Sequence, residues 1–420
     1  MEYAFTTLGA LIGLAVAIIL IVRKFNPAYS LILGALVGGL IGSGNLTLTV
    51  STMMDGASSM ITSVLRIMTS GILAGALIKT GSAEKIAQTI VGKLGARRGL
   101  IAVTLATAVI CAVGVFVDIS VITVAPIALA IGKKAGFNKS SLLLAMIGGG
   151  KAGNIISPNP NTIAVSEAFN VDLTSLMYRN IIPAVCAVIV TILLASFLSK
   201  KNGVLVTEMD IEESHNRELP AFWKAILGPV VVIALLSLRS ICGIAIDPMI
   251  ALPVGGLMSV IVCGDFKNFS AYAEFGLSKV TGVSILLLGT GTIAGIIKAS
   301  ALQVDVVNIL NFFNMPAFLL APIAGILMAG ATASTTAGAT VAAQTFSSIL
   351  LQEGVPAISA GAMINAGATV IDSLPHGSFF HATGGSVNIE IKDRMKLIGY
   401  EACIGMTSTA ASVLVYLIAG

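Results

Sequence analysis

The chain has 420 residues, of which 56% are hydrophobic and 10% are charged, with a net charge of +4. Soluble domains carry about 25% charged residues, so this composition excludes a soluble globular protein and indicates a protein that lipid surrounds. The net charge is small and spread over loops, so it gives no indication of nucleic acid as a partner. At about 20 residues for each membrane span, the length allows roughly ten to twelve crossings of a lipid bilayer.

Basic residues between the first apolar stretches set the expected topology. Arg23 and Lys24 follow the first stretch, and the positive-inside rule puts them in the cytoplasm, with the N-terminus outside. Arg66 and Glu167 lie near expected span ends, so we expect them at the membrane interface. The helices expected here cover residues 4–22, 28–41 and 60–78, with an amphipathic interfacial helix at 82–94.

Two unusual stretches follow in the first half. Residues 100–132 are apolar apart from Asp118, and basic residues flank the stretch on both sides. Both ends are therefore expected in the cytoplasm, either as a re-entrant hairpin with Asp118 near its tip or as two full spans. Residues 141–169 contain the string GGGKAGNIISPNPNT, whose four glycines and two prolines predict a broken transmembrane helix.

The second half repeats this plan after an expected cytoplasmic linker at residues 202–220, with further spans expected at 223–241, 249–263 and 280–297. Residues 316–351 form a second same-side pair with the tip GATASTTAG, and residues 358–387 form a second helix, broken at NAGATVIDSLPHGSF. The string AMI at 145–147 recurs at 362–364, a spacing of 217 residues that also relates the two broken helices.

The two halves are expected to begin on opposite sides of the membrane. We therefore predict an all-α polytopic membrane protein built from two inverted repeats, each with a re-entrant hairpin and a broken transmembrane helix. The first repeat is expected at residues 1–201 and the second at residues 221–420. Inverted repeats recur in secondary transporters, because one site at the repeat interface can open to either side.

The two breaks carry polar residues into the expected membrane core. Backbone groups without helical hydrogen bonds must there be buried in protein or line a wet cavity, so matching breaks predict a polar cavity near the midplane. A helix that starts at a break points free N–H groups and partial positive charge into the cavity, which favours an anion. The candidate binding residues are Asp118, Ser120, Lys151, Asn154, Ser157, Asn159, Asn161, Thr162, Ser334, Thr335, Thr336, Asn365, Asp372, Ser373, His376 and Ser378.

Ionisable residues within the membrane are costly to bury, so each is a functional candidate. Lys151 is expected either to attract a substrate carboxylate or to pair with Asp118 or Asp372. We expect Asp118, Asp372 and His376 to carry a coupling ion, His376 because imidazoles titrate near neutral pH. His376 and His381 are five residues apart, the wrong spacing for two ligands on one helical face, so we expect no metal site. No cofactor is expected.

Three strings resemble the gluconate permease (GntP) family over nearly the whole chain. They are GGGKAGNIISPNPNTIA, TASTTAGATVAAQTF and AGATVIDSLPHGSFFHATGGSVN. The resemblance implies uptake of gluconate and related sugar acids, small hydroxy acids or D-serine. It also implies coupling to a proton in preference to sodium, no use of ATP, and the bacterial inner membrane. A wider group of ion transporters implies hairpin tips at 118–120 and 334–336 and a homodimer.

We therefore expect a proton symporter for a small organic anion such as gluconate. One alternative is a cation/proton antiporter that uses Asp118 and Asp372, and another is a carrier of a different small carboxylate or of D-serine. An intramembrane enzyme is not expected, because the sequence offers no pair of a nucleophile and a base, and no nucleotide-binding motif.

Overall fold

The computed structural model describes residues 3–210, 218–312 and 315–419, and all regular elements within these ranges are helices. The prediction of an all-α membrane protein is confirmed. Residues 211–217 of the predicted linker at 202–220 lie outside the described residues. The described part of that linker contacts the start of α8 (Lys139–Asn154), where the backbone N–H of Lys139 donates to the carbonyl oxygen of Val204 at 2.8 Å.

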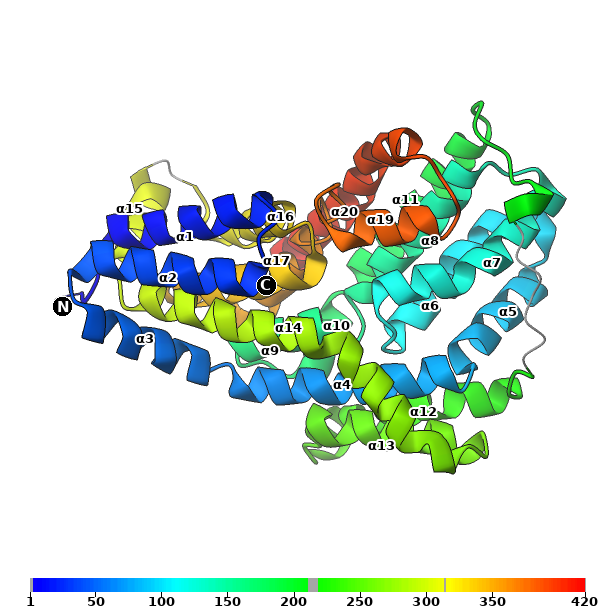
Figure 1. The fold of residues 1–420 in the computed structure, drawn as a ribbon, viewed down its shortest axis with the longest axis horizontal. Coiled ribbons are helices and arrows are strands. Elements are labelled where there is room, and N and C mark those ends of the chain that lie inside the picture. Colours follow the sequence, from blue (N-terminus) through cyan, green and yellow to red (C-terminus); the bar gives the residue numbers. More distant parts are fainter. Residues whose placement is uncertain (1–2, 211–217, 313–314, 420) are drawn as a thin grey trace.

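The α-helices fall into two series, one before and one after the linker (Figure 1). The first series comprises α1 (Thr7–Val22), α2 (Pro27–Ser43), α3 (Leu46–Ser58), α4 (Ile61–Lys79), α5 (Ser82–Leu94), α6 (Gly99–Ala112), α7 (Val117–Ala135), α8 (Lys139–Asn154), α9 (Pro160–Ala168), α10 (Leu173–Arg179) and α11 (Ile181–Ser199). The second comprises α12 (Phe222–Cys242), α13 (Pro248–Val262), α14 (Phe269–Lys298), α15 (Leu302–Phe312), α16 (Leu320–Thr332), α17 (Thr335–Gln352), α18 (Ala357–Gly367), α19 (Ser378–Gly385) and α20 (Ile391–Ala419).

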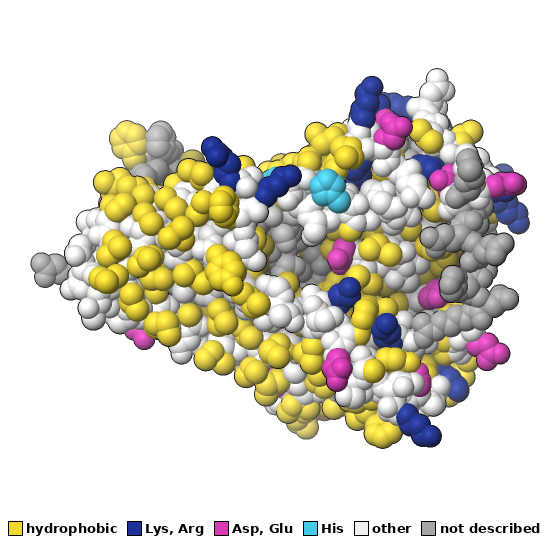
Figure 2. Space-filling view, in the orientation of Figure 1, with side chains coloured by type: hydrophobic (Ala, Val, Ile, Leu, Met, Phe, Trp, Pro, Cys, Tyr) yellow, Lys and Arg dark blue, Asp and Glu magenta, His cyan; other side chains and the backbone are white. Residues whose placement is uncertain are grey.

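Four helical segments of the described chain are long and apolar enough to cross a membrane by themselves. They are Leu46–Lys79, Ile181–Ser199, Phe266–Lys298 and Ile391–Ala419, and shorter apolar helices include α1, α2, α12 and α13. The first of these has 34 residues, and a helix of that length measures about 51 Å, well above the ~30 Å of a bilayer core. The segment is divided at residues 59–60 into the helices α3 and α4. Hydrophobic side chains cover the lobe of α1 to α3 (Figure 2).

The helices α4 and α14 cross at a point where neither has a side chain. A Cβ atom added to Gly276 would lie 1.8 Å from the carbonyl oxygen of Gly71, and one added to Gly75 would lie 2.2 Å from that of Tyr272. Small residues allow two helices in lipid to approach this closely. The two crossing helices therefore form a rigid frame on which the shorter helices pack, and this frame is visible in the lower half of Figure 1.

The glycine run in the first break has a different role from the predicted one. The helix α8 continues through Gly148 and Gly149 to Asn154, so only residues 155–159 interrupt the helix. A Cβ at Gly149 would lie 2.2 Å from the carbonyl oxygen of Thr104 on α6. The glycines thus allow close packing of α8 against its neighbours, and the prolines alone mark the break.

Candidate functional site

The first break joins α8 to α9 through a short turn that its own side chains stabilise. The side chain of Asn159 accepts a hydrogen bond from the backbone N–H of Thr162 at 3.1 Å and so caps α9. Its amide nitrogen donates to the carbonyl oxygen of Asn154 at 2.8 Å, which satisfies the last turn of α8. Pro160 occupies the first turn of α9, where its missing N–H removes no helical hydrogen bond.

The second break lies between α18 and α19, and hydrogen bonds join it to the first. The amide nitrogen of Asn161 donates to the side-chain oxygen of Asn365 at 2.8 Å. The amide nitrogen of Asn365 donates in turn to the hydroxyl of Thr162 at 3.3 Å. Residues more than 200 positions apart therefore hold the two breaks side by side.

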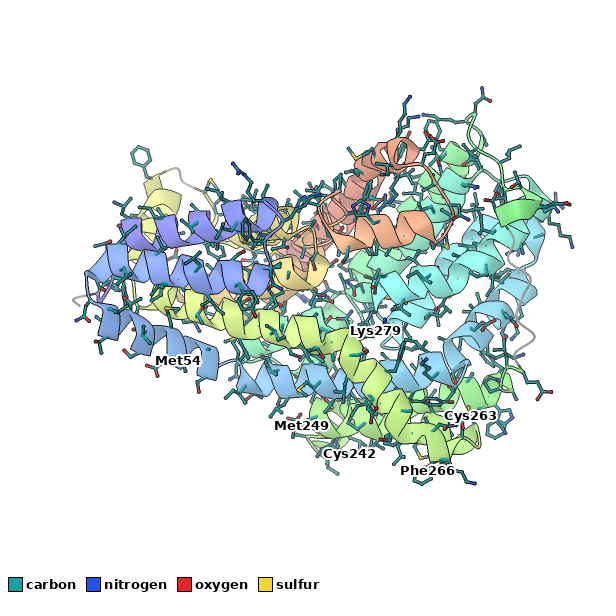
Figure 3. The ribbon with its side chains drawn as sticks, in the orientation of Figure 1. Met54, Cys242, Met249, Cys263, Phe266 and Lys279 are labelled. Atoms are coloured by element: carbon teal, nitrogen blue, oxygen red, sulfur yellow. The ribbon has the colours of Figure 1, made fainter. Side chains whose placement is uncertain are left out.

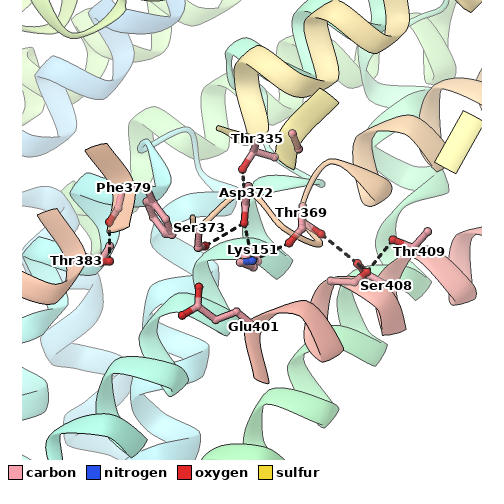
Figure 4. Close-up of polar contacts among 12 residues, drawn as sticks. Lys151, Thr335, Thr369, Asp372, Ser373, Phe379, Thr383, Glu401, Ser408 and Thr409 are labelled. Atoms are coloured by element: carbon pink, nitrogen blue, oxygen red, sulfur yellow. Dashed lines mark hydrogen bonds and ion pairs between the residues drawn. The ribbon is translucent and has the colours of Figure 1, made fainter. Parts of the chain in front are cut away.

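A buried ion pair makes the second link between the breaks (Figure 4). The ammonium nitrogen of Lys151 on α8 lies 2.6 Å from a carboxylate oxygen of Asp372 and 2.7 Å from the carbonyl oxygen of Thr369. The Asp372 carboxylate also accepts hydrogen bonds from the hydroxyls of Thr335 and Ser373. The side chains of the pair are only 2% and 3% exposed. Of the two roles predicted for Lys151, the structure gives it the pairing with Asp372.

Two turns complete the site. One connects α6 to α7 at residues 113–116, and the other connects α16 to α17, where Ala333 takes a left-handed conformation with φ of 46°. The hydroxyl of Ser334 accepts a hydrogen bond from the backbone N–H of Ala337 at 3.3 Å and caps α17. Asp118 lies in the first turn of α7 and is half-buried.

Both breaks and both turns border one cavity of about 250 Å³, and the face shown in Figure 2 is hollowed where these elements meet. The cavity is open enough that Lys279 and Ser378 on its wall are exposed. It is lined by Phe116, Val117, Asp118, Ile119, Asn154, Asn159, Pro160, Asn161, Lys279, Val280, Val283, Ala333, Ser334, Thr335, Thr336, Asp372, Ser378 and Phe379.

Four helices start at the wall of this cavity, namely α7, α9, α17 and α19. The N-terminus of a helix carries about half a positive charge and unpaired N–H groups. The caps of α9 and α17 come from Asn159 and Ser334, whereas Phe116 and Gly377 give α7 and α19 no side-chain cap. The combined field of these four N-termini makes the cavity favourable for an anion.

Nine of the predicted binding residues line the cavity, and the others lie behind its wall. The lining residues are Asp118, Asn154, Asn159, Asn161, Ser334, Thr335, Thr336, Asp372 and Ser378. Behind the wall, Ser120 donates to the carbonyl oxygen of Phe116 at 2.9 Å. His376 contacts the carbonyl oxygen of Ala331 at 3.2 Å. Lys151, Thr162, Asn365 and Ser373 are buried in the supporting network, whereas the buried hydroxyl of Ser157 has no hydrogen-bond partner in the described part of the chain. The binding roles of all these residues stay predictions.

Sequence reasoning missed the contribution of α14 to the cavity wall. The sequence predicted a helix only from residue 280, because the polar stretch that ends at Lys279 carries little apolar signal. In the structure α14 begins at Phe269, so Lys279 lies inside the helix and lines the cavity with Val280 and Val283. The available signal was the lysine itself, one position before an apolar run.

A separate charged cluster joins α4 to the far end of α9. Arg66 forms an ion pair with Glu167, and its Nε donates to a carboxylate oxygen of Asp247 at 3.0 Å. Burial raises the pKa of the Asp247 carboxyl, but the hydrogen bond and charge of Arg66 outweigh burial and lower it overall. Arg66 and Glu167 were predicted at the membrane interface, and the structure adds that they connect two separate helices. The three residues border a second hollow of about 240 Å³.

Comparison with known proteins identifies the family. The model of the GntP family permeases matches residues 5–419. The chain is 52% identical over 411 residues to an uncharacterized transporter of Haemophilus influenzae, with 98% of each chain covered. It is 21% identical over 405 residues to a gluconate permease of Zymomonas mobilis, with 89% of each covered. The solved structure of the YdaH transporter of Alcanivorax borkumensis shares the fold, with a TM-score of 0.62 at 13% identity and 98% of each chain covered. The resemblance read from the sequence is thereby confirmed, and the chain belongs to the GntP family of permeases.

Proposed function

We propose that this permease is a secondary transporter that carries a small hydroxylated carboxylate across the bacterial inner membrane together with a proton. The observation that carries the proposal is the convergence of four helix N-termini on one polar cavity. Their partial positive charges favour a carboxylate, and the amide and hydroxyl groups of Asn161, Ser334 and Thr336 can hydrogen-bond the hydroxyls of a sugar acid. The gluconate permease among the relatives has a substrate of this chemistry.

The two series of helices are, in this proposal, inverted repeats with two re-entrant hairpins. The matching order of α6 to α9 and α16 to α19 supports the repeat. The positive-inside rule puts the starts of α14 and α20 in the cytoplasm. Lys279 and Ser378 are exposed on the cytoplasmic halves of their elements, so the cavity opens toward the cytoplasm. A homodimer is expected from the resemblance.

The opposite side of the protein is closed by the cluster around Arg66. Arg66 belongs to the frame helix α4, whereas Glu167 belongs to α9, which starts at the cavity. Outward opening requires α9 to move away from α4 and so requires this ion pair to break. In alternating access, the outer side then opens while the inner side closes, and both states share one binding site.

Asp118 is the proposed proton carrier. It lines the cavity, and no ion pair joins it to another residue in the described part of the chain. Asp372 already has Lys151 as its partner, and His376 lies behind the wall with its ring nitrogen on a carbonyl oxygen. A carboxylate that can take up one proton would allow a monoanion to enter without adding net charge to the cavity.

Uptake into proteoliposomes tests this function. Labelled gluconate, glycerate, 3-hydroxybutyrate and D-serine are offered with and without an imposed inward proton gradient. We expect the gradient to accelerate uptake of at least one carboxylate, and Asp118→Asn to remove the acceleration. Failure of every substrate would refute the proposal. Because Asp118 also suits a cation/proton antiporter, sodium-driven dequenching of an internal pH dye without any organic anion is the result that would favour that alternative.

A further inference from the structure

One lysine lies behind the cavity wall and another lies on it, and only the first is in a close ion pair. The Lys151 ammonium is 2% exposed and holds the Asp372 carboxylate and the Thr369 carbonyl, so little of its charge is left for a substrate. Lys279 is exposed on the cavity wall. In the described part of the chain no carboxylate lies within ion-pair distance of it, although the Asp118 carboxylate interacts with it electrostatically from the same cavity wall. Its ammonium lies 5.1 Å from the ring centroid of Phe275. A cation on a ring face keeps its N–H donors free for an anion.

The position of Lys279 on α14 is rigid. One turn earlier, Gly276 packs directly on α4 with no room for a side chain, and the next residue, Val280, is buried. The side chain of Lys279 (Figure 3) therefore leaves the frame on the side of the cavity, which Asp118 and Ser378 also line. Groups that recognise a ligand are most selective when a rigid element holds them.

A second group near Lys279 also lacks a partner. The amide nitrogen of Asn154 is buried at the cavity wall and has no hydrogen-bond partner, although the carbonyl oxygen of the same residue accepts from Asn159. A buried donor without an acceptor is costly, and a bound ligand oxygen would remove that cost. The cavity thus presents one free ammonium and one free amide donor to an oxygen-rich ligand.

The charges of the cavity limit the ligand to one carboxylate. Lys151 and Asp372 cancel each other, so Lys279 and Asp118 decide the net charge. When Asp118 is protonated the cavity carries one positive charge, and a monocarboxylate brings it to zero. A dicarboxylate would leave an unpaired negative charge, and a neutral analogue an unpaired positive charge. Unpaired charges in a membrane interior are costly.

We propose that Lys279 is the specificity-determining residue, which pairs with the substrate carboxylate and selects monocarboxylates over neutral amides and dicarboxylates. The inference rests on the proposed transport function, and it names the substrate class of that same site. An ammonium–carboxylate hydrogen bond that the bound substrate shields from water contributes roughly 1.5–3 kcal/mol, which corresponds to about a 10- to 150-fold preference.

Competition measurements in proteoliposomes test this inference. Uptake of labelled gluconate is inhibited by unlabelled gluconate, by gluconamide, which has no charge, and by the dicarboxylate glucarate. The wild-type protein is expected to prefer gluconate over gluconamide by at least about tenfold. Lys279→Met is expected to raise the KM for gluconate about tenfold and to bring the two inhibition constants within about threefold, and Lys279→Arg to restore most of the preference.

Lys267→Met is the matched control, because it removes an exposed lysine that lies two residues before the start of α14 and does not line the cavity. It should keep the wild-type preference. If Lys279→Met does not fold, Lys279→Gln repeats the test with a polar side chain. Gluconate uptake with an unchanged preference in these variants overturns the role of Lys279 and leaves transport intact. Wild-type vesicles that take up no carboxylate overturn both proposals.

Discussion

The ion pair between Lys151 and Asp372 provides the sharpest test of how the two breaks are held together. Lys151→Met removes the ammonium and leaves the Asp372 carboxylate buried with two hydroxyl donors. Removing one partner of a buried pair costs about 3–5 kcal/mol, because the other charge stays in a medium of low dielectric constant. We therefore expect Lys151→Met to lower the free energy of unfolding by that amount.

The chain contains a control ion pair with the same distance between its charged atoms. Lys133 and Glu208 lie 2.6 Å apart, the same distance as Lys151 and Asp372, but their side chains are 40% and 86% exposed instead of 2% and 3%. An exposed pair contributes only about 0–1 kcal/mol. Lys133→Met should therefore leave stability nearly unchanged, so the comparison isolates burial from the chemistry of the pair.

Equilibrium unfolding with SDS in mixed micelles measures both variants. The double variant Lys151→Met with Asp372→Asn should be less destabilised than the sum of its single variants, by about 1–3 kcal/mol, because no unpaired charge remains. The reasoning is refuted if Lys151→Met falls within 1 kcal/mol of Lys133→Met, since water would then reach the pair in the folded protein.

Three further predictions concern the frame, the outer side and the linker. Gly276→Ala should destabilise the protein by about 1–3 kcal/mol or more in the same titration, whereas Gly282→Ala on the same helix, where a Cβ meets nothing within 4 Å, should have no such effect. Arg66→Met should increase external maleimide labelling of Ser334→Cys about fivefold in a cysteine-free background. The reason is that the Arg66 ion pair stabilises the closed outer side by roughly 1 kcal/mol. Unchanged labelling would contradict the proposed closure of the outer side. Burial raises the pKa of the Asp210 carboxyl, but its hydrogen bonds from Lys139 and the adjacent chain outweigh burial and lower it. This contribution to stability is present above the unfolded-state pKa of about 3.9 and is lost as the pH falls through the lower folded-state value, so Asp210→Asn should flatten the decrease of melting temperature below pH 4.

The sequence predicted the breaks because their signals are local. Pro158 and Pro160 cannot continue a helix, and the polar residues around them would be unfavourable on a lipid-facing surface. Asp118 and Lys151 stood out for the same reason, as charges within apolar stretches. The pairing of Lys151 with Asp372 could be proposed because a buried cation needs an anion, and few anions were available in the same region.

The remainder of the site depends on tertiary packing that no local pattern encodes. The glycines at 148–150 were interpreted as breaks, because a glycine that breaks a helix and one that admits a neighbouring backbone look alike in a sequence. Lys279 was missed because the beginning of the long helix α14 has a mixed polar composition. Arg66 was interpreted as interfacial, and its link to Glu167 joins residues 101 positions apart.

The distribution of charge explains why one residue can control selection in so polar a cavity. The four helix N-termini are backbone features, so they attract any anion and cannot distinguish a monocarboxylate from a dicarboxylate. The charges of Lys151 and Asp372 cancel and serve to hold the breaks together. Discrimination must therefore come from a group whose charge is not compensated within the protein. In the described part of the cavity wall only Lys279 and Asp118 lie outside a close ion pair; they offset each other electrostatically until Asp118 takes up a proton, which leaves the charge of Lys279 to the substrate carboxylate.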